Sequence, residues 1–246
     1  MKVVKIGAGK KVIVLLHGGG LSWWNYKAVA ESLSKDFTVC LPILDGHGGS
    51  DREFISIEEN AIEIIRYIDE EFLGQIELLG GLSLGGQIAA EIISRRPNIC
   101  KALILESVCT RPSRITNMLV KPMMDSSFWL IKHRWFAKLQ FTSLKIDNSL
   151  FENYYEDTCK ITKESMIKFL LANTEYSLKD SIKNTTARVK VLVGAKEQGN
   201  MIASARDIVA LLRNSELQIL DGLYHGEFSI NHPEEYANCV RKMLLQ

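Results

Sequence analysis

The sequence predicts an α/β fold in which a mostly parallel central sheet is covered by helices on both faces. Unbroken apolar runs rich in β-branched residues alternate with segments whose apolar residues recur at helical spacing. Such runs are typical of strands buried on both faces of a parallel sheet, and their alternation with amphipathic helices is typical of α/β domains. The alternation stops in the middle of the chain, where only helical patterns occur, and then resumes.

Each predicted strand is a short apolar run bounded by residues that favour turns. The runs cover residues 3–6, 12–16, 37–41, 76–79, 102–105, 189–193 and 217–220. Helical spacing predicts helices from residue 22 to about 33, over 57–71, after residue 83, over 202–212 and after residue 233. Ser22 is expected to cap the first of these helices, because a serine hydroxyl accepts a hydrogen bond from a free N–H group of the first turn.

The middle of the chain is predicted to be an α-helical insertion over the sheet. Helical patterns cover residues 115–124, 128–139, 150–159 and 162–171, and this segment is rich in methionine and aromatic residues. We therefore expect two parts of an α/β core, residues 1–107 and 186–246, separated by a helical cap over residues 108–185.

Composition and charge exclude several classes of protein. The 246 residues are 46% hydrophobic and 24% charged, which is ordinary for a globular protein. A formal net charge of +1 provides no basic excess for nucleic acid and leads us to expect no polybasic membrane patch. No apolar run approaches the roughly 18 residues that a membrane-spanning helix needs, so no membrane insertion is expected.

The cysteines and the N-terminus favour a cytoplasmic location. The five cysteines are odd in number and widely spaced, without any C-x-x-C pair, so neither a disulfide framework nor a zinc site is expected. Met1 leads directly into a strand pattern with no long apolar leader segment. No metal or organic cofactor is expected, and the sequence leaves the oligomeric state open, a homodimer included.

The stretch with the clearest chemistry is Gly81-Leu82-Ser83-Leu84-Gly85, which fits the pattern G-x-S-x-G. Small residues two positions on either side of the serine allow a sharp turn that exposes its hydroxyl between a strand and a helix. Free N–H groups and the helix dipole at the start of that helix favour negative charge beside the serine. The same pattern also occurs in ordinary flexible turns, but its place between a predicted strand and a predicted helix favours a nucleophile.

Four motifs together resemble the α/β-hydrolase superfamily. They are His17-Gly18-Gly19-Gly20, the glycine-rich loop over residues 45–50, the Ser83 turn, and Gly194-Ala195-Lys196-Glu197 followed by Leu223-Tyr224-His225-Gly226. The resemblance covers essentially the whole chain outside the helical insertion. It implies the α/β-hydrolase fold without one of the usual antiparallel edge strands, and the activity of a serine hydrolase of the carboxylesterase or lipase type.

The resemblance also implies a catalytic triad and an oxyanion hole. Ser83 would be the nucleophile and His225 the base, because a serine hydroxyl needs a base to attack at neutral pH. Glu197 occupies the position at which the family usually has the triad aspartate. Glu106, at the end of the 102–105 run, is the alternative acid. The backbone N–H groups of Gly19 and Leu84 would hold the oxyanion.

The expected substrate is a small-molecule ester with a small to medium apolar acyl group, cleaved through an acyl-enzyme. Trp23 and Trp24, after the first glycine turn, and Phe128 and Trp129, in the insertion, are candidates for the acyl pocket, although helix packing explains them as well. The same triad acts on amide, thioester or carbon–carbon bonds and in acyl transfer, and a ligand-binding receptor of this fold is the rival from another class. The sequence leaves these alternatives open.

Overall fold

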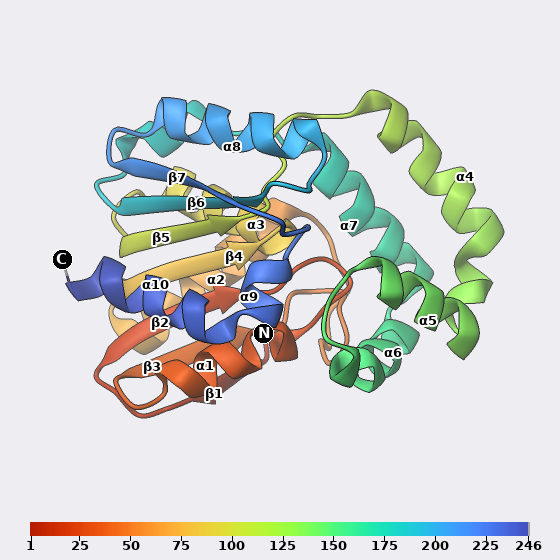
Figure 1. Ribbon diagram of the computed structural model, residues 1–246, viewed down its shortest axis with the longest axis horizontal. Coiled ribbons are helices and arrows are strands. Elements are labelled where there is room, and N and C mark those ends of the chain that lie inside the picture. Colours follow the sequence, from red (N-terminus) through yellow and green to blue (C-terminus); the bar gives the residue numbers. More distant parts are fainter. Residues whose placement is uncertain (246) are drawn as a thin grey trace.

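A seven-stranded sheet forms the middle layer of the protein (Figure 1). The computed structural model describes residues 1–245. The strands are β1 (Val3–Ile6), β2 (Lys11–Leu16), β3 (Phe37–Pro42), β4 (Ile76–Leu82), β5 (Cys100–Glu106), β6 (Arg188–Gly194) and β7 (Ser215–Leu220). Their order in the sheet is β1-β3-β2-β4-β5-β6-β7, in which β1 pairs antiparallel with β3 and the other neighbours pair parallel.

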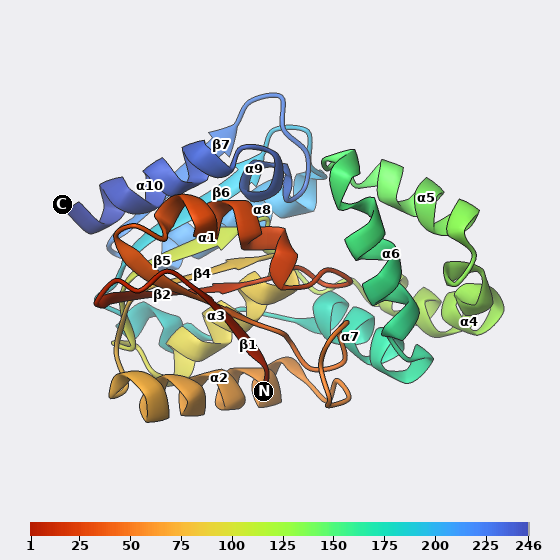
Figure 2. The same cartoon turned by 90° about the horizontal axis from the view of Figure 1, so that it is seen from below.

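Helices cover both faces of the sheet, and each face has its own hydrophobic core (Figure 2). One core includes side chains from α2 (Ile57–Phe72), α3 (Leu84–Arg95) and α8 (Gly199–Leu211). The other includes side chains from α1 (Lys27–Leu33), α9 (Glu227–Asn231) and α10 (Pro233–Leu245). The predicted α/β fold is therefore confirmed, and its strands lie within one or two residues of the predicted runs at most boundaries.

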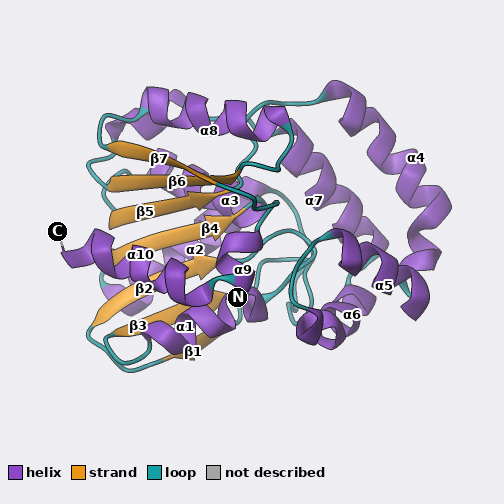
Figure 3. Cartoon of the chain, viewed as in Figure 1, coloured by secondary structure: helices purple, strands orange, loops and turns teal. Residues whose placement is uncertain are grey.

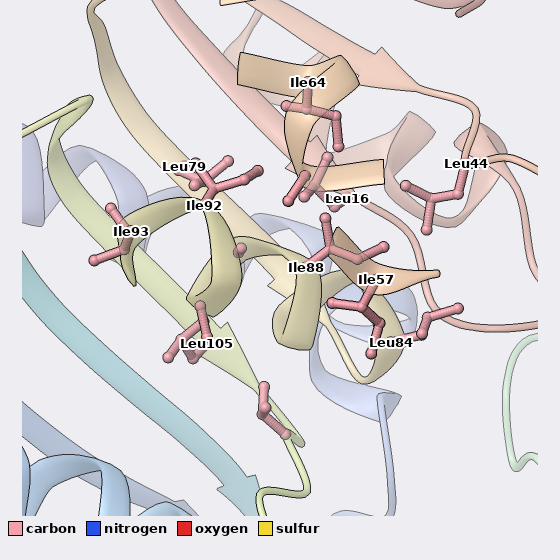
Figure 4. Packing of buried hydrophobic residues seen from close by; sticks show 14 of the residues in the cluster. Leu16, Leu44, Ile57, Ile64, Leu79, Leu84, Ile88, Ile92, Ile93 and Leu105 are labelled. Carbon is pink, nitrogen blue, oxygen red and sulfur yellow. The ribbon is translucent and has the colours of Figure 1, made fainter. Parts of the chain in front are cut away.

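Helix α3, which begins directly after Ser83, is deeply buried. Every residue from Leu84 to Ser94 is buried. Leu84, Ile88 and Ile92 belong to the same core cluster as Leu16 of the sheet and Ile57 of α2 (Figure 4). Burying a side chain of this kind contributes about 1.5–3 kcal/mol, so this packing fixes α3 and the turn before it firmly against the sheet.

The strand order places two loops at the point of the sheet where connections leave in opposite directions. From β2 the chain passes through α1 to β3 on one side, whereas β4 pairs with β2 on its other side. Loops that leave neighbouring parallel strands in opposite directions open a crevice at the carboxyl ends of the strands, which is where open α/β sheets bind ligands. The glycine turn after β2 and the Ser83 turn after β4 are the two loops at this point.

Four longer helices lie between β5 and β6. They are α4 (Arg114–Ile131), α5 (Arg134–Ser143), α6 (Phe151–Lys160) and α7 (Lys163–Glu175). Figure 3 shows them beyond the end of the sheet toward which the parallel strands run. The expected division between the first two helices at residues 125–127 is wrong. Helix α4 continues through the exposed Pro122, because water can satisfy the one carbonyl that loses its N–H partner, and it ends at Ile131.

The expectation that Ser22 caps the first helix is also wrong. A short 3-10 turn over Trp23–Tyr26 precedes α1, and the Ser22 side chain makes no cap hydrogen bond. Its hydroxyl is buried and donates to the Gly48 carbonyl at 3.0 Å. Ser22 therefore joins the loop after β2 to the loop after β3 instead of starting a helix.

Helix α7 is bound to the start of α3 by a reciprocal amide pair. Gln87 Nε2 donates to the carbonyl oxygens of Asn173 and Cys109 at 3.0 and 2.8 Å, and Asn173 Nδ2 donates to Gln87 Oε1 at 3.1 Å. Gln87 is buried, so these bonds satisfy polar groups that would otherwise be costly to bury. They hold α7 against the start of α3.

Candidate active site

The chain bends sharply at Ser83, and only glycine fits at the positions on either side of this bend. A Cβ atom at Gly81 would overlap the Gly85 carbonyl, and one at Gly85 would overlap the carbonyls of Leu16 and His17. Ser83 itself has φ 53° and ψ −115°, a conformation that non-glycine residues rarely adopt. Its side chain makes no cap hydrogen bond to the helix, and its backbone N–H donates to the Glu106 carbonyl at 2.9 Å. The bend thus leaves the Ser83 hydroxyl at the start of α3 without a cap hydrogen bond to the helix.

Glu197 and His225 form a close pair in the loops after β6 and β7. His225 Nδ1 lies 2.8 Å from Glu197 Oε2. The Glu197 side chain is 1% exposed, whereas that of His225 is 47% exposed. With the proton on Nδ1 donated to this carboxylate, Nε2 carries a free lone pair, which is the form of imidazole that acts as a base.

The other oxygen of the Glu197 carboxylate is also occupied. Glu197 Oε1 accepts from the Gly194 N–H at 2.7 Å and from the Ser107 hydroxyl at 2.8 Å. Burial raises the pKa of a carboxyl group, but the hydrogen bonds from His225, Gly194 and Ser107 outweigh it, and the pKa of Glu197 lies below its ordinary value. Glu197 is therefore held as a carboxylate beside the imidazole.

Ser107 is a residue that the sequence motifs did not single out. It is buried, with φ 55°, and its hydroxyl donates to Glu197 while accepting from the Gly226 N–H at 3.3 Å. One side chain thus links the carboxylate to the backbone directly after His225. The only signal for Ser107 in the sequence was its position directly after Glu106, at the end of a predicted strand.

The His225 loop packs against the Ser83 turn. A Cβ atom at Gly226 would lie 3.0 Å from both terminal methyl carbons of Leu82, the residue before Ser83. The loops that carry Ser83 and His225 are therefore neighbours at the carboxyl ends of β4 and β7, and Glu197 contacts His225 from the loop after β6.

Gly19 and Leu84, whose N–H groups are the expected oxyanion donors, also lie side by side. A Cβ atom at Gly19 would be 3.5 Å from Leu84 Cδ2 and 3.6 Å from Phe169 Cε2. Phe169, from α7, also stacks on His47 with ring centroids 4.7 Å apart. The structure thus adds an aromatic ring beside the glycine turn that sequence spacing could not place, because it belongs to a helix about 150 residues further along the chain.

Glu106, the alternative acid, faces a different environment. Its side chain is buried, and Oε1 accepts from the Ser229 N–H of α9 at 3.1 Å. Burial raises its pKa to about 7; the Ser229 hydrogen bonds and His225 oppose the shift, and the charge on Glu197 adds to it. Within the described residues, Oε2 of Glu106 has no hydrogen-bond partner, and neither do the nearby hydroxyls of Tyr26 and Tyr236.

Two other histidines near the crevice are buried and neutral. His17 Nε2 accepts from the Leu44 N–H at 3.1 Å, and His17 Nδ1 lies 2.9 Å from the Gly18 carbonyl. Burial lowers the pKa of His17 to about 3 and that of His47 to about 4. Both rings brace the loops after β2 and β3.

The four aromatic residues expected at the acyl pocket have different surroundings. Trp24 is buried and its Nε1 donates to Asp157 Oδ2 at 2.9 Å, which ties the glycine turn to α6. Trp23 and Phe128 are half-buried against the two cores. Trp129 is 62% exposed on α4. The structure does not gather these four side chains into one group.

Among residues 1–245 there is no cluster of three or more histidine, cysteine or acidic side chains arranged to hold a metal ion. The described helices also include none with the length and apolar character needed to cross a bilayer.

Comparison with known proteins identifies the family. Residues 7–229 match the family model described as serine aminopeptidase, S33. The chain belongs to this family of α/β hydrolases. A relative of this hydrolase is a pimeloyl-[acyl-carrier protein] methyl ester esterase from Aromatoleum aromaticum, which is 25% identical over 256 aligned positions that cover 94% of this chain and 97% of the relative.

Solved structures share the fold of this S33-family hydrolase at low sequence identity. A thermophilic esterase from Thermogutta terrifontis has a TM-score of 0.78 and 21% identity, with 99% of this chain and 92% of that chain covered. A bromoperoxidase from Bacillus anthracis has a TM-score of 0.84 and 15% identity, with 99% and 95% covered. Proteins with such different names share this fold, so the activity of this hydrolase has to be argued from its own site.

Glu106 predicts a pH-dependent stability for this S33-family hydrolase. Because the folded protein binds the Glu106 proton more tightly than the unfolded chain does, the resulting stability is complete below about pH 4.5 and is lost as the pH rises through about 7. Glu106→Gln replaces the ionisable carboxyl group with an amide, so this variant does not lose stability over that pH range. Relative to wild type, its free energy of unfolding should rise by about 3 kcal/mol between pH 4.5 and 8, since one pKa unit corresponds to about 1.4 kcal/mol.

Urea unfolding of both proteins across this pH range tests the prediction. Glu216→Gln is the control, because Glu216 is an exposed carboxylate on β7. A stability difference between Glu106→Gln and wild type that stays constant with pH would show that Glu106 titrates normally.

Proposed function

We propose that this protein is a serine hydrolase that cleaves carboxylic esters of small to medium apolar acyl groups through an acyl-enzyme intermediate. The observation that carries the proposal is the 2.8 Å contact between His225 Nδ1 and Glu197 Oε2, beside a serine in a strained turn at the start of a buried helix. The Aromatoleum aromaticum relative, named as a methyl ester esterase, supports ester cleavage.

In this mechanism Ser83 Oγ attacks the ester carbonyl carbon while His225 Nε2 takes the hydroxyl proton. Glu197 keeps the imidazole in the tautomer with the proton on Nδ1 and stabilises the imidazolium that forms. The backbone N–H groups of Gly19 and Leu84 hold the oxyanion of the tetrahedral intermediate. His225 then returns the proton to the leaving alcohol, and a water molecule, activated by the same imidazole, releases the acid from Ser83.

The residues around the glycine turn support an apolar acyl group. Phe169 lies against Gly19, and Leu84 and Leu82 flank the nucleophile. We propose Phe169 as a wall of the acyl pocket, in addition to Trp23, Trp24 and Phe128. Trp129, which is 62% exposed on α4, is no longer a candidate for it. Helices α4–α7, over residues 108–185, would act as the cap of the site, because the Gln87–Asn173 pair binds α7 directly to the start of α3.

A second candidate reaction is cleavage of an amide bond by the same residues. It is favoured by the family model, whose description is that of a serine aminopeptidase. Parallel assays with p-nitrophenyl butyrate and with aminoacyl p-nitroanilides separate the two reactions, since each reports one type of bond.

We also propose a cytoplasmic location, which the five free cysteines support.

The first test is covalent labelling of Ser83. A fluorophosphonate probe should label wild type at Ser83, as peptide mapping would show, and Ser83→Ala should lose both labelling and at least a thousandfold of p-nitrophenyl butyrate turnover. Ser94→Ala, at a buried serine near the other end of α3, is the control and should keep both. Full turnover by Ser83→Ala would remove Ser83 as the nucleophile.

A second test compares the two candidate acids. Glu197→Gln should lower kcat by about a thousandfold, because the imidazole loses its charged partner and its tautomer. Glu106→Gln should lower kcat by less than tenfold, because Glu106 accepts from the Ser229 N–H, whereas the imidazole is hydrogen-bonded to Glu197. Steady-state kinetics at one pH decide between them, and the reverse order of effects would make Glu106 the acid.

A third test concerns Ser107. Ser107→Ala removes a hydroxyl that donates to the Glu197 carboxylate, and a hydrogen bond to a charged group contributes about 1.5–3 kcal/mol. We expect kcat to fall about tenfold with little change in KM, because Ser107 positions the acid and contacts no substrate.

Ser204→Ala is the matched control for Ser107→Ala. Ser204 is also buried, and its hydroxyl accepts from the Thr110 N–H at 3.0 Å away from the pair of Glu197 and His225. Equal losses of kcat in the two variants would mean that Ser107 acts through general stability alone.

A further inference from the structure

Helix α4 carries an apolar face that points away from the protein. Five large apolar side chains on it are between 52% and 77% exposed: Ile115, Met118, Leu119, Met123 and Trp129. The residues that α4 buries, Val120, Met124 and Ile131, recur at helical spacing on the opposite side. Helix α5 continues this pattern, with Trp135 63% and Leu139 64% exposed. Exposed apolar groups gathered in this way mark an interaction surface more often than scattered ones do.

Basic residues accompany this apolar face. At 100° per residue, Arg114, Lys121 and Lys132 fall in one row along the flank of α4, between its buried side and its exposed apolar side, and all three are exposed. Asp125, the one acidic residue over 111–145, is paired with Lys163 at 2.8 Å. Helix α5 adds Lys138, whereas its Arg134 is paired with Glu152. The formal net charge of +1 for the whole chain therefore hides a local excess of positive charge.

We propose that the exposed face of α4 binds an anionic lipid surface. A helix that combines apolar and tryptophan side chains on one face with lysine and arginine along the flank is typical of helices that lie in the plane of a membrane interface. The long basic side chains reach the lipid headgroups, while the apolar groups enter the acyl boundary. Helix α4 lies on the surface in this arrangement, since it is not apolar enough to span a bilayer.

Charge favours this occupant over a second copy of the chain. Two copies of the α4 face would bring like-charged rows together, which disfavours association. An anionic bilayer complements the row, and each basic residue near such a surface strengthens binding about fivefold.

The proposed surface is connected to the crevice. Helix α4 packs on α7, whose Phe169 lies against Gly19. A membrane bound at α4 would therefore lie on the outer side of the helices that cover Ser83, so that an apolar ester could pass from the bilayer toward the crevice. Lipid binding itself does not depend on the hydrolytic activity, and it can be measured separately.

The experiment uses full-length Ser83→Ala protein, so that no ester is cleaved, with vesicles of equal parts phosphatidylglycerol and phosphatidylcholine. Flotation should show binding that weakens in pure phosphatidylcholine and at high salt. Trp129 and Trp135 are the two exposed tryptophans among the four in the chain, so their emission should shift to shorter wavelength on binding. Trp129→Phe with Trp135→Phe should remove most of that shift.

Two pairs of variants locate the surface. Arg114→Glu with Lys121→Glu should weaken binding more than tenfold, whereas Lys10→Glu with Lys35→Glu, the same change at exposed lysines outside α4, should not. Met118→Ser with Leu119→Ser should also weaken it, with Ile55→Ser, at an exposed residue before α2, as control. Circular dichroism verifies that each variant is folded.

Three outcomes would overturn the proposal. The first is no flotation of folded protein with anionic vesicles, and the second is equal binding by the α4 variants and their controls. The third is a lipid-free dimer in size-exclusion chromatography that Met118→Ser with Leu119→Ser dissociates, which would make the face a contact between two copies.

Discussion

The close approach of α3 to the ends of β2 and β4 is the constraint on which the rest of the site depends. Glycine at positions 81 and 85 lets the helix start directly against the Leu16 carbonyl, where any side chain would overlap the backbone. The burial of α3 from Leu84 to Ser94 then holds the strained conformation of Ser83 in place. A turn with the same residues at the surface would relax, so the core of the protein maintains the geometry of its candidate nucleophile.

The carboxylates at the ends of β5 and β6 show how the surroundings decide the chemistry of like groups. Glu197 is buried, but its oxygens accept from His225, Gly194 and Ser107, and it stays ionised. Glu106 is fully buried, within the described residues one of its oxygens has no partner, and its pKa rises to about 7. Burial acts on both carboxyl groups, and the hydrogen bonds to Glu197 outweigh it whereas those to Glu106 do not.

The insertion between β5 and β6 has two sides with different chemistry. Its inner side meets the core through the Gln87–Asn173 amide pair and through Phe169, which lies against the glycine turn. Its outer side, on α4 and α5, is apolar and basic. A segment of this kind would connect the candidate site to the proposed binding surface, so that the proposed cap and the proposed surface belong to the same four helices.

The sequence by itself determined the fold class, the seven strands and the glycine-flanked turn at Ser83, because periodicity and steric restriction are local properties. It did not decide which glutamate contacts His225, since both follow neighbouring strands and their partners lie far along the chain. Local periodicity also failed at Ser22 and Pro122, where contacts and solvent exposure override propensity. Only the tertiary structure selected Glu197 and added Ser107 and Phe169, because hydrogen bonds between loops from β5, β6 and β7, and the packing of α7, form only when distant segments meet.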